Sequence, residues 1–143
     1  MIEERNYFLL AGALLTAIAV ALHLGCIFFG APWYRFFGAG ERMAELAAAR
    51  SRYPTAVSSA IALTLSVWSL YALSGAAVIP RLPLLRPVLC VVTAIFLLRG
   101  RAVVVLVPLS LGRSTAFWWW SSAICLLIGT LHLVGLRQVW ERL

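Results

Sequence analysis

Four long apolar runs place the strongest limit on what this chain can fold into. They cover about residues 7–30, 55–79, 82–108 and 115–136. A helix needs about 20 predominantly apolar residues to cross the hydrocarbon of a bilayer, and in lipid only helices and closed barrels satisfy every backbone polar group. The runs therefore predict an all-α integral membrane protein, a bundle of four transmembrane helices that forms a single domain over residues 1–143.

The composition agrees with burial in lipid and argues against nucleic acid as a partner. Of the residues, 63% are hydrophobic and 12% are charged, which is about half the charge of an ordinary soluble domain. The net charge is +7, and every basic residue is an arginine that flanks or interrupts an apolar run. Such arginines anchor helices and contact anionic headgroups, so we expect membrane lipids as partners. The all-arginine usage suggests a GC-rich genome and a bacterial inner (cytoplasmic) membrane.

Neither the cysteines nor the histidines predict a metal or cofactor site. Cys26, Cys90 and Cys125 lie within apolar runs and form no C-x-x-C pair, which is typical of small buried side chains. His23 and His132 should differ in depth by about 15 Å, at 1.5 Å per residue along oppositely directed helices. They therefore cannot share a metal or a haem iron, and we expect His132 to have a structural role near the end of its helix.

The first connection, residues 31–54, is long and is expected to carry a short interfacial helix. Its second half, residues 41–52, is rich in alanine and follows a Gly-Ala-Gly break. As a helix it would turn Met43 and Leu46 toward lipid or toward the bundle. Aromatic residues of the kind found at membrane–water boundaries precede it. They are Trp33, Tyr34, Phe36 and Phe37.

The other connections and the small residues indicate how the helices are arranged. Pro80 and Pro83 prevent a continuous helix, so the second and third spans should be antiparallel neighbours with both termini on one face. Small residues spaced by four favour close packing of the first two spans, against each other or against a neighbouring helix. In the first span they are Ala13, Ala17, Ala21 and Gly25; in the second, Ser58, Ala62 and Ser66, followed by Ser69.

Charge and length bear on the orientation of the protein in the membrane and on whether the first span is retained. Five arginines flank each face, so the positive-inside rule leaves the orientation open. The first run is longer than the apolar region of a signal peptide, and we expect it to be retained as a span.

The third apolar run is interrupted by Arg99 and Arg101. Charged residues within spans are costly and mark functional sites by default. The two arginines are about 200° apart on a helix, so one should face the bundle and the other should reach headgroups or water. We expect Arg99 to be the inward one, because its face is otherwise apolar. The alternative is that the helix ends at Leu98 and both arginines are ordinary boundary charges.

These polar positions predict a ligand pocket in the half of the bundle nearer the long loop. The expected ligand-binding residues are His23, Arg99, Glu41, Ser59, Trp118 and Ser121. Arg99 would hold negative charge, His23 would form a hydrogen bond, and tryptophan would stack on the apolar part of the ligand. Glu41 of the long loop is the acidic residue best placed to pair with an inward Arg99, unless an anionic ligand takes its place. The function expected is binding or transport of a small amphipathic or anionic ligand, with lipid as one candidate.

Two other functions are compatible with the sequence. One is a membrane-embedded enzyme that uses His23 as an acid–base, although no catalytic motif is present and the chain contains no aspartate. The other is an accessory or assembly subunit of a larger membrane complex, docked through its charges and long loop. A homo-oligomer and a membrane partner protein both remain open.

Overall fold

The computed structural model describes residues 4–109 and 115–143, and its long helices are those expected from the apolar runs. Among the described residues, four helical segments are long and apolar enough to cross a membrane. They are α1 (Tyr7–Phe29), α4 (Arg52–Gly75), α5 (Leu85–Arg101) with the start of α6 (Val103–Leu109), and α7 (Thr115–Val139). The described residues contain no β-strand. The prediction of an all-helical chain with four candidate spans is confirmed.

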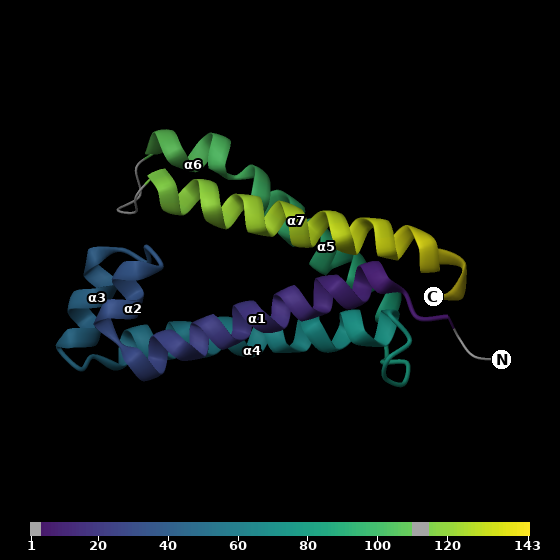
Figure 1. Cartoon of the computed structure of the whole chain (residues 1–143), viewed down its shortest axis with the longest axis horizontal. Coiled ribbons are helices and arrows are strands. Elements are labelled where there is room, and N and C mark those ends of the chain that lie inside the picture. The colour runs from purple at the N-terminus through teal and green to yellow at the C-terminus, as the bar shows by residue number, and fades with distance from the viewer. Residues whose placement is uncertain (1–3, 110–114) are drawn as a thin grey trace.

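The helices form two layers (Figure 1). Helices α1 and α4 lie side by side in one layer, and α5, α6 and α7 form the other. The described chain ends lie together at one end of the molecule, where Arg142 donates a hydrogen bond to the main-chain oxygen of Glu4 at 3.2 Å. We call this end the termini end and the opposite one the loop end.

Polar residues set the helix ends. The Asn6 side chain accepts a hydrogen bond from the amide of Leu9 at 2.9 Å and caps α1. Ser51 caps α4 in the same way, so α4 begins at Arg52 and not at residue 55 as expected. At its other end, the Ser74 hydroxyl donates to the carbonyl of Pro80 and accepts from the amide of Leu82. This turn ends α4 at Gly75, four residues earlier than predicted.

The third span continues past Leu98. Helix α5 runs through Arg99 and Gly100 to Arg101, and α6 follows after Ala102. Gly100 allows α7 to approach closely, because a Cβ at this position would lie 2.9 Å from the main-chain nitrogen of Leu126. The alternative in which the helix ends at Leu98 is therefore wrong.

The two layers are joined by buried apolar clusters. At the termini end, leucines of α1, α5 and α7 pack together with Ala76 and Val139. In the middle, Leu65 of α4 packs against Val92, Phe96 and Ile128. Burial of such side chains from lipid gains little hydrophobic energy, so close packing and dispersion hold these contacts.

The small residues of α1 do not form one buried stripe. Ala13 and Gly25 are buried, whereas Ala17 and Ala21 are exposed. Each step of four residues advances about 400° around the helix, so successive small residues drift by about 40°. The four small residues therefore do not all lie on the buried face. The predicted contact between α1 and α4 is present at Ala13, whose carbonyl accepts a hydrogen bond from Ser69 at 2.9 Å.

The long connection contains two short helices, α2 (Ala31–Phe36) and α3 (Glu41–Ala48). Helix α2 was not predicted, and α3 ends before residue 52 because Arg50 adopts a left-handed φ of 58°. Met43 and Leu46 are half-buried. The Tyr34 hydroxyl forms a 2.9 Å hydrogen bond with that of Ser58, which ties the connection to α4.

Candidate functional site

The guanidinium of Arg99 is held against the second turn of α7. Its Nη2 donates to the hydroxyl of Ser121 at 2.9 Å, and its Nη1 donates to that of Ser122 at 3.3 Å. The guanidinium carbon lies 5.1 Å from the ring centre of Trp118. Successive turns of α7 place these three side chains on the face that α5 covers. We call Arg99, Trp118, Ser121 and Ser122 the Arg99 cluster.

The Arg99 cluster contains a positive charge and no negative one. A guanidinium carries five N–H donors, and within the described residues its hydrogen-bond acceptors are the two serine hydroxyls. No carboxylate in the described ranges pairs with Arg99. The Ser121 hydroxyl donates to the main-chain oxygen of Trp118 at 3.4 Å, and a hydroxyl can turn from such a long contact to another acceptor. The cluster therefore offers a fixed cation and adjustable donors, which is the chemistry that binds an anionic group.

Glu41 does not serve as the partner of Arg99. Its carboxylate forms an ion pair with Arg35 at 2.6 Å, and Arg35 Nε donates to it at 2.9 Å. Both side chains are exposed at the loop end. The hydrogen bond from Arg35, aided by its charge, holds the pKa of the Glu41 carboxyl below its ordinary value. Glu41 is closer in sequence to Arg35, and the turn between α2 and α3 brings the two together.

The two arginines of the third span differ as expected in their surroundings. Arg99 is half-buried and contacts α7, whereas Arg101 is exposed. The physical reason is the rotation of about 200° between positions two apart on a helix. Arg101 is therefore a suitable comparison for experiments on Arg99.

His23 and Ser59 lie apart from the Arg99 cluster in the contacts of the described chain. The Nδ1 atom of His23 is 2.8 Å from the carbonyl of Ala19 in its own helix, and the ring is half-buried. Ser59 is exposed, and its neighbour Ser58 is the buried serine of α4. Of the six predicted ligand-binding residues, the structure brings together Arg99, Trp118 and Ser121.

Sequence reasoning missed Ser122 and the burial of His132. Ser122 is 2% exposed and contacts Arg99, and its adjacency to Ser121 was the available signal. His132 is fully buried and its Nδ1 lies 2.8 Å from the carbonyl of Ile128. It packs on Phe96 of α5, with ring centres 5.6 Å apart, rather than at the helix end. The hydrophobic periodicity of the sequence did not predict the burial of His132, because that burial depends on how the two layers pack together.

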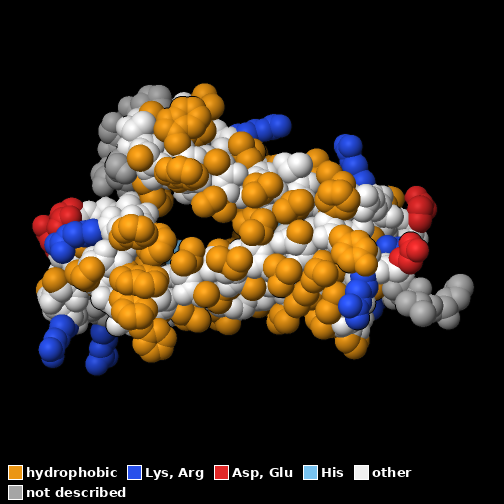
Figure 2. Space-filling view, in the orientation of Figure 1, with side chains coloured by type: hydrophobic (Ala, Val, Ile, Leu, Met, Phe, Trp, Pro, Cys, Tyr) orange, Lys and Arg blue, Asp and Glu red, His pale blue; other side chains and the backbone are white. Residues whose placement is uncertain are grey.

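Figure 2 shows a hollow between the α1/α4 layer and the other layer, toward the loop end. The two layers also make close contacts. At Gly12, a Cβ would lie 2.7 Å from His132 on α7, and at Gly38, a Cβ would lie 2.9 Å from Phe117. Arg99 lies about 21 Å along α5 from Leu85, at 1.5 Å per residue. The Arg99 cluster is therefore in the half of the molecule that contains the hollow.

The described residues hold no group of three or more histidines, cysteines or carboxylates that could bind a metal ion. The chain was compared with protein-family models, curated proteins and solved structures, and none of them matches it. The chemistry of the residues themselves is therefore what indicates a function.

Proposed function

We propose that this protein is a four-helix membrane bundle that binds a small anionic amphipathic molecule at the Arg99 cluster. Arg99 holds the anionic group, the hydroxyls of Ser121 and Ser122 donate to it, and Trp118 contacts the adjoining apolar part. The ligand enters from the hollow between the two layers. In this proposal α3 lies at the membrane surface, and the membrane is a bacterial inner membrane.

The observation that carries the proposal is the guanidinium of Arg99 within a candidate span, with serine hydroxyls and an indole as its surroundings. A charge in a membrane span is costly unless it is paired, and a buried charge is stabilised when a counter-charge with good geometry is supplied. None of the described carboxylates supplies it. An anionic ligand would, and arginine is well suited to the planar, two-point recognition of carboxylate or phosphate.

The apolar surroundings favour an amphipathic ligand over a fully hydrophilic one. Trp119 and Trp120, beside the cluster on α7, are exposed to the outside of the molecule. Indole rings are enriched where apolar chains meet polar headgroups. A ligand with a charged head and an apolar body would be matched along its whole length.

The test is to identify what the protein retains through purification. The full chain and its Arg99→Ala, Arg99→Lys and Arg101→Ala variants are purified in mild detergent, and bound molecules are extracted and identified by mass spectrometry. We expect one anionic amphipathic compound, enriched over bulk lipid, in the parent chain and in Arg101→Ala. Arg99→Ala should lose it, and Arg99→Lys should keep a reduced share.

Two results would overturn the proposal. One is the absence of any enriched anionic compound in the parent chain. The other is equal retention in Arg99→Ala and Arg101→Ala. Circular dichroism and size-exclusion profiles of each variant separate loss of the ligand from loss of the fold.

A further inference from the structure

We propose that the anionic group bound at the Arg99 cluster is a carboxylate, and that the ligand is a monocarboxylate with one acyl chain, such as a fatty acid. This inference rests on the proposed function and narrows its ligand to one chemical class. It is supported by the N–H donors that Arg99 still offers, by the single positive charge of the cluster, and by the depth of Arg99 in its span.

The guanidinium of Arg99 has three N–H groups beyond the two that bind serine. It carries five donors in all, and the hydrogen bonds to Ser121 and Ser122 use one on each Nη. The donors that remain include Nε–H, which lies on the same edge of the planar group as one Nη–H. Two parallel N–H groups on one edge match the two oxygens of a carboxylate.

The donors of Arg99 are positioned before any ligand binds. Trp118 and Ser122, which contact the guanidinium, are 5% and 2% exposed. Gly100, the next residue on α5, packs so closely on α7 that a Cβ there would lie 2.9 Å from the main-chain nitrogen of Leu126. A donor set fixed in this way loses little conformational freedom on binding.

The single positive charge of the cluster favours a monoanion. Arg101, the other arginine of this segment, is exposed and lies about 200° around the helix. A carboxylate and Arg99 together form a neutral pair. A phosphomonoester carries about −1.5 to −2 charges at pH 7, so it would leave negative charge without a partner inside the span, which is costly.

The depth of Arg99 favours a carboxylate over the phosphate of a membrane phospholipid. The candidate span runs from Leu85 to Val105, so Arg99 lies about 9 Å inside its end at 1.5 Å per residue. The phosphate of a phospholipid is esterified on both sides, and polar groups next to it would have to leave water as well. A carboxylate at the end of an acyl chain brings only its own two oxygens, so its desolvation costs less.

The acyl chain of the ligand has apolar surroundings beside the cluster. Figure 2 shows the hollow between the two layers toward the loop end, the half of the molecule that contains Arg99. Phe96, one turn before Arg99 on α5, packs against Leu65 and Ile128, and its ring centre is 5.3 Å from that of Trp68. Apolar side chains therefore continue from the cluster toward the middle of the molecule, along the path of a chain that starts at Arg99.

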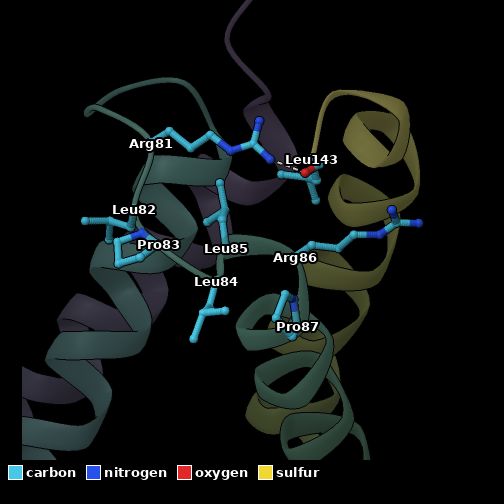
Figure 3. A pocket seen from close by; sticks show the side chains of 8 residues that line it. All are labelled: Arg81, Leu82, Pro83, Leu84, Leu85, Arg86, Pro87 and Leu143. Atoms are coloured by element: carbon cyan, nitrogen blue, oxygen red, sulfur yellow. Dashed lines mark hydrogen bonds between the residues drawn. The ribbon is translucent and has the colours of Figure 1, made fainter.

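The arginines of the α4–α5 turn differ from Arg99 in their partners. Arg81 donates to the main-chain oxygens of Arg142 and Leu143, and Figure 3 shows its guanidinium beside Leu143. Arg86 extends away from Arg81 (Figure 3) and stacks on Trp140, with its guanidinium carbon 3.7 Å from the ring centre. Arg81→Gln is therefore a control that removes one positive charge without changing the Arg99 cluster.

The test is a competition assay on the full chain in mild detergent at neutral pH. Tritium-labelled oleate is bound to the immobilised protein, and scintillation proximity reports its displacement. The competitors are oleate, oleoyl lysophosphatidic acid, phosphatidylglycerol, oleyl alcohol and acetate. Lysophosphatidic acid presents a phosphomonoester and phosphatidylglycerol a phosphodiester. Oleyl alcohol has the chain without the charge, and acetate has the carboxylate without the chain.

We expect oleate to compete at the lowest concentration. The two phosphate lipids should need about tenfold more, and oleyl alcohol and acetate about a hundredfold more. Arg99→Gln should weaken oleate binding about fiftyfold, and Arg99→Lys about tenfold, because an ammonium keeps the charge but lacks the two-point fork. Arg101→Gln and Arg81→Gln should bind oleate as the parent chain does. The order of competitors is measured on the parent chain, so the test stands if an Arg99 variant fails to fold.

Three results would overturn the inference. One is the absence of saturable oleate binding to the folded parent chain. Another is a phosphate lipid or acetate that competes at or below the concentration of oleate. In these two cases the proposed function still stands if purification yields another enriched anionic amphipathic compound whose retention depends on Arg99. The third is equal oleate binding in the parent chain and in folded Arg99→Gln, which would count against the proposed function as well.

Discussion

Gly12 and His132 lie in direct contact across the two layers, since a Cβ at Gly12 would come within 2.7 Å of both Cε1 and Nδ1 of the imidazole. The ring is fully buried between α1 and Phe96 of α5. The imidazole therefore fits in the interior because Gly12 has no side chain. Gly135, one turn further along α7, allows a similar approach of Leu9.

Gly12→Ala should destabilise the protein by about 1–3 kcal/mol, because the added methyl overpacks the contact with His132. Unfolding of the purified protein in mixed micelles, followed by circular dichroism, measures the change. In a His132→Ala background the same substitution should cost less, since the methyl then meets open space. An equal cost in the two backgrounds would show that the glycine and the histidine do not interact.

His132→Leu should leave stability unchanged or raise it. A carbonyl can only accept, so Nδ1 of His132 donates to Ile128 and Nε2 carries a lone pair. That Nε2 atom has no hydrogen-bond partner among the described residues, and an unsatisfied buried polar atom typically costs about 1–3 kcal/mol. Thermal unfolding compares His132→Leu with His23→Leu at the half-buried histidine. A loss of several kcal/mol at position 132 would contradict the assignment.

Ser122→Ala should lower stability by roughly 1–2 kcal/mol, because its hydroxyl is buried and is a partner of the charged Arg99. Ser59→Ala is the matched control on α4, where the side chain is exposed, and should change stability by less than about 0.5 kcal/mol. Chemical denaturation of both variants in detergent gives the comparison. Equal effects at the two serines would place Ser122 outside the polar contacts of Arg99.

The Glu41–Arg35 pair should weaken under acid. The pKa of Glu41 is lowered in the folded protein by the hydrogen bond from Arg35, so its contribution is present above the ordinary value of 4.5 and is lost as the pH falls through the folded value. Hydrogen exchange of α2 and α3 should therefore quicken in that range. Glu41→Gln should remove this pH dependence, whereas Glu45→Gln, on the same helix, should retain it.

Both chain ends should be accessible from one side of the membrane. Cysteines placed at positions 4 and 143, in a background without the native cysteines, should react with a membrane-impermeant reagent from the same side. A cysteine at the exposed Phe36 should react from the opposite side. Labelling of positions 4 and 143 from different sides would contradict the order of spans.

The sequence by itself determined the four long helical segments and their order. Run length alone identifies a span, because the thickness of a bilayer and the rise of a helix set the number of apolar residues required. Local hydrogen bonds then decided where the helices begin and end. Because of them, α4 begins three residues and ends four residues earlier than the apolar run predicted. The capping side chains Ser51 and Ser74 were present in the sequence, but their partners depend on the path of the turn.

The side-chain environments of the candidate site were only partly predictable. Positions two apart on a helix are rotated by about 200°, so Arg99 and Arg101 lie on different faces of the third span. The sequence alone could therefore distinguish their surroundings. The choice of Ser59 over Ser58, and of Glu41 as the partner of Arg99, concerned contacts between elements far apart in the chain. The rotation of α4 turns Ser58, one residue before Ser59, toward Tyr34. The turn between α2 and α3 brings Glu41 to Arg35.

What only the tertiary structure decided is how the two layers meet. Small residues at Gly12, Gly100 and Gly135 permit approach, but they do not specify which neighbour approaches. That choice depends on the combined packing of three helices, and it buries His132 while leaving the hollow toward the loop end. Periodicity reports the faces of one helix at a time, and lipid provides no difference in polarity to distinguish an inward apolar face from an outward one.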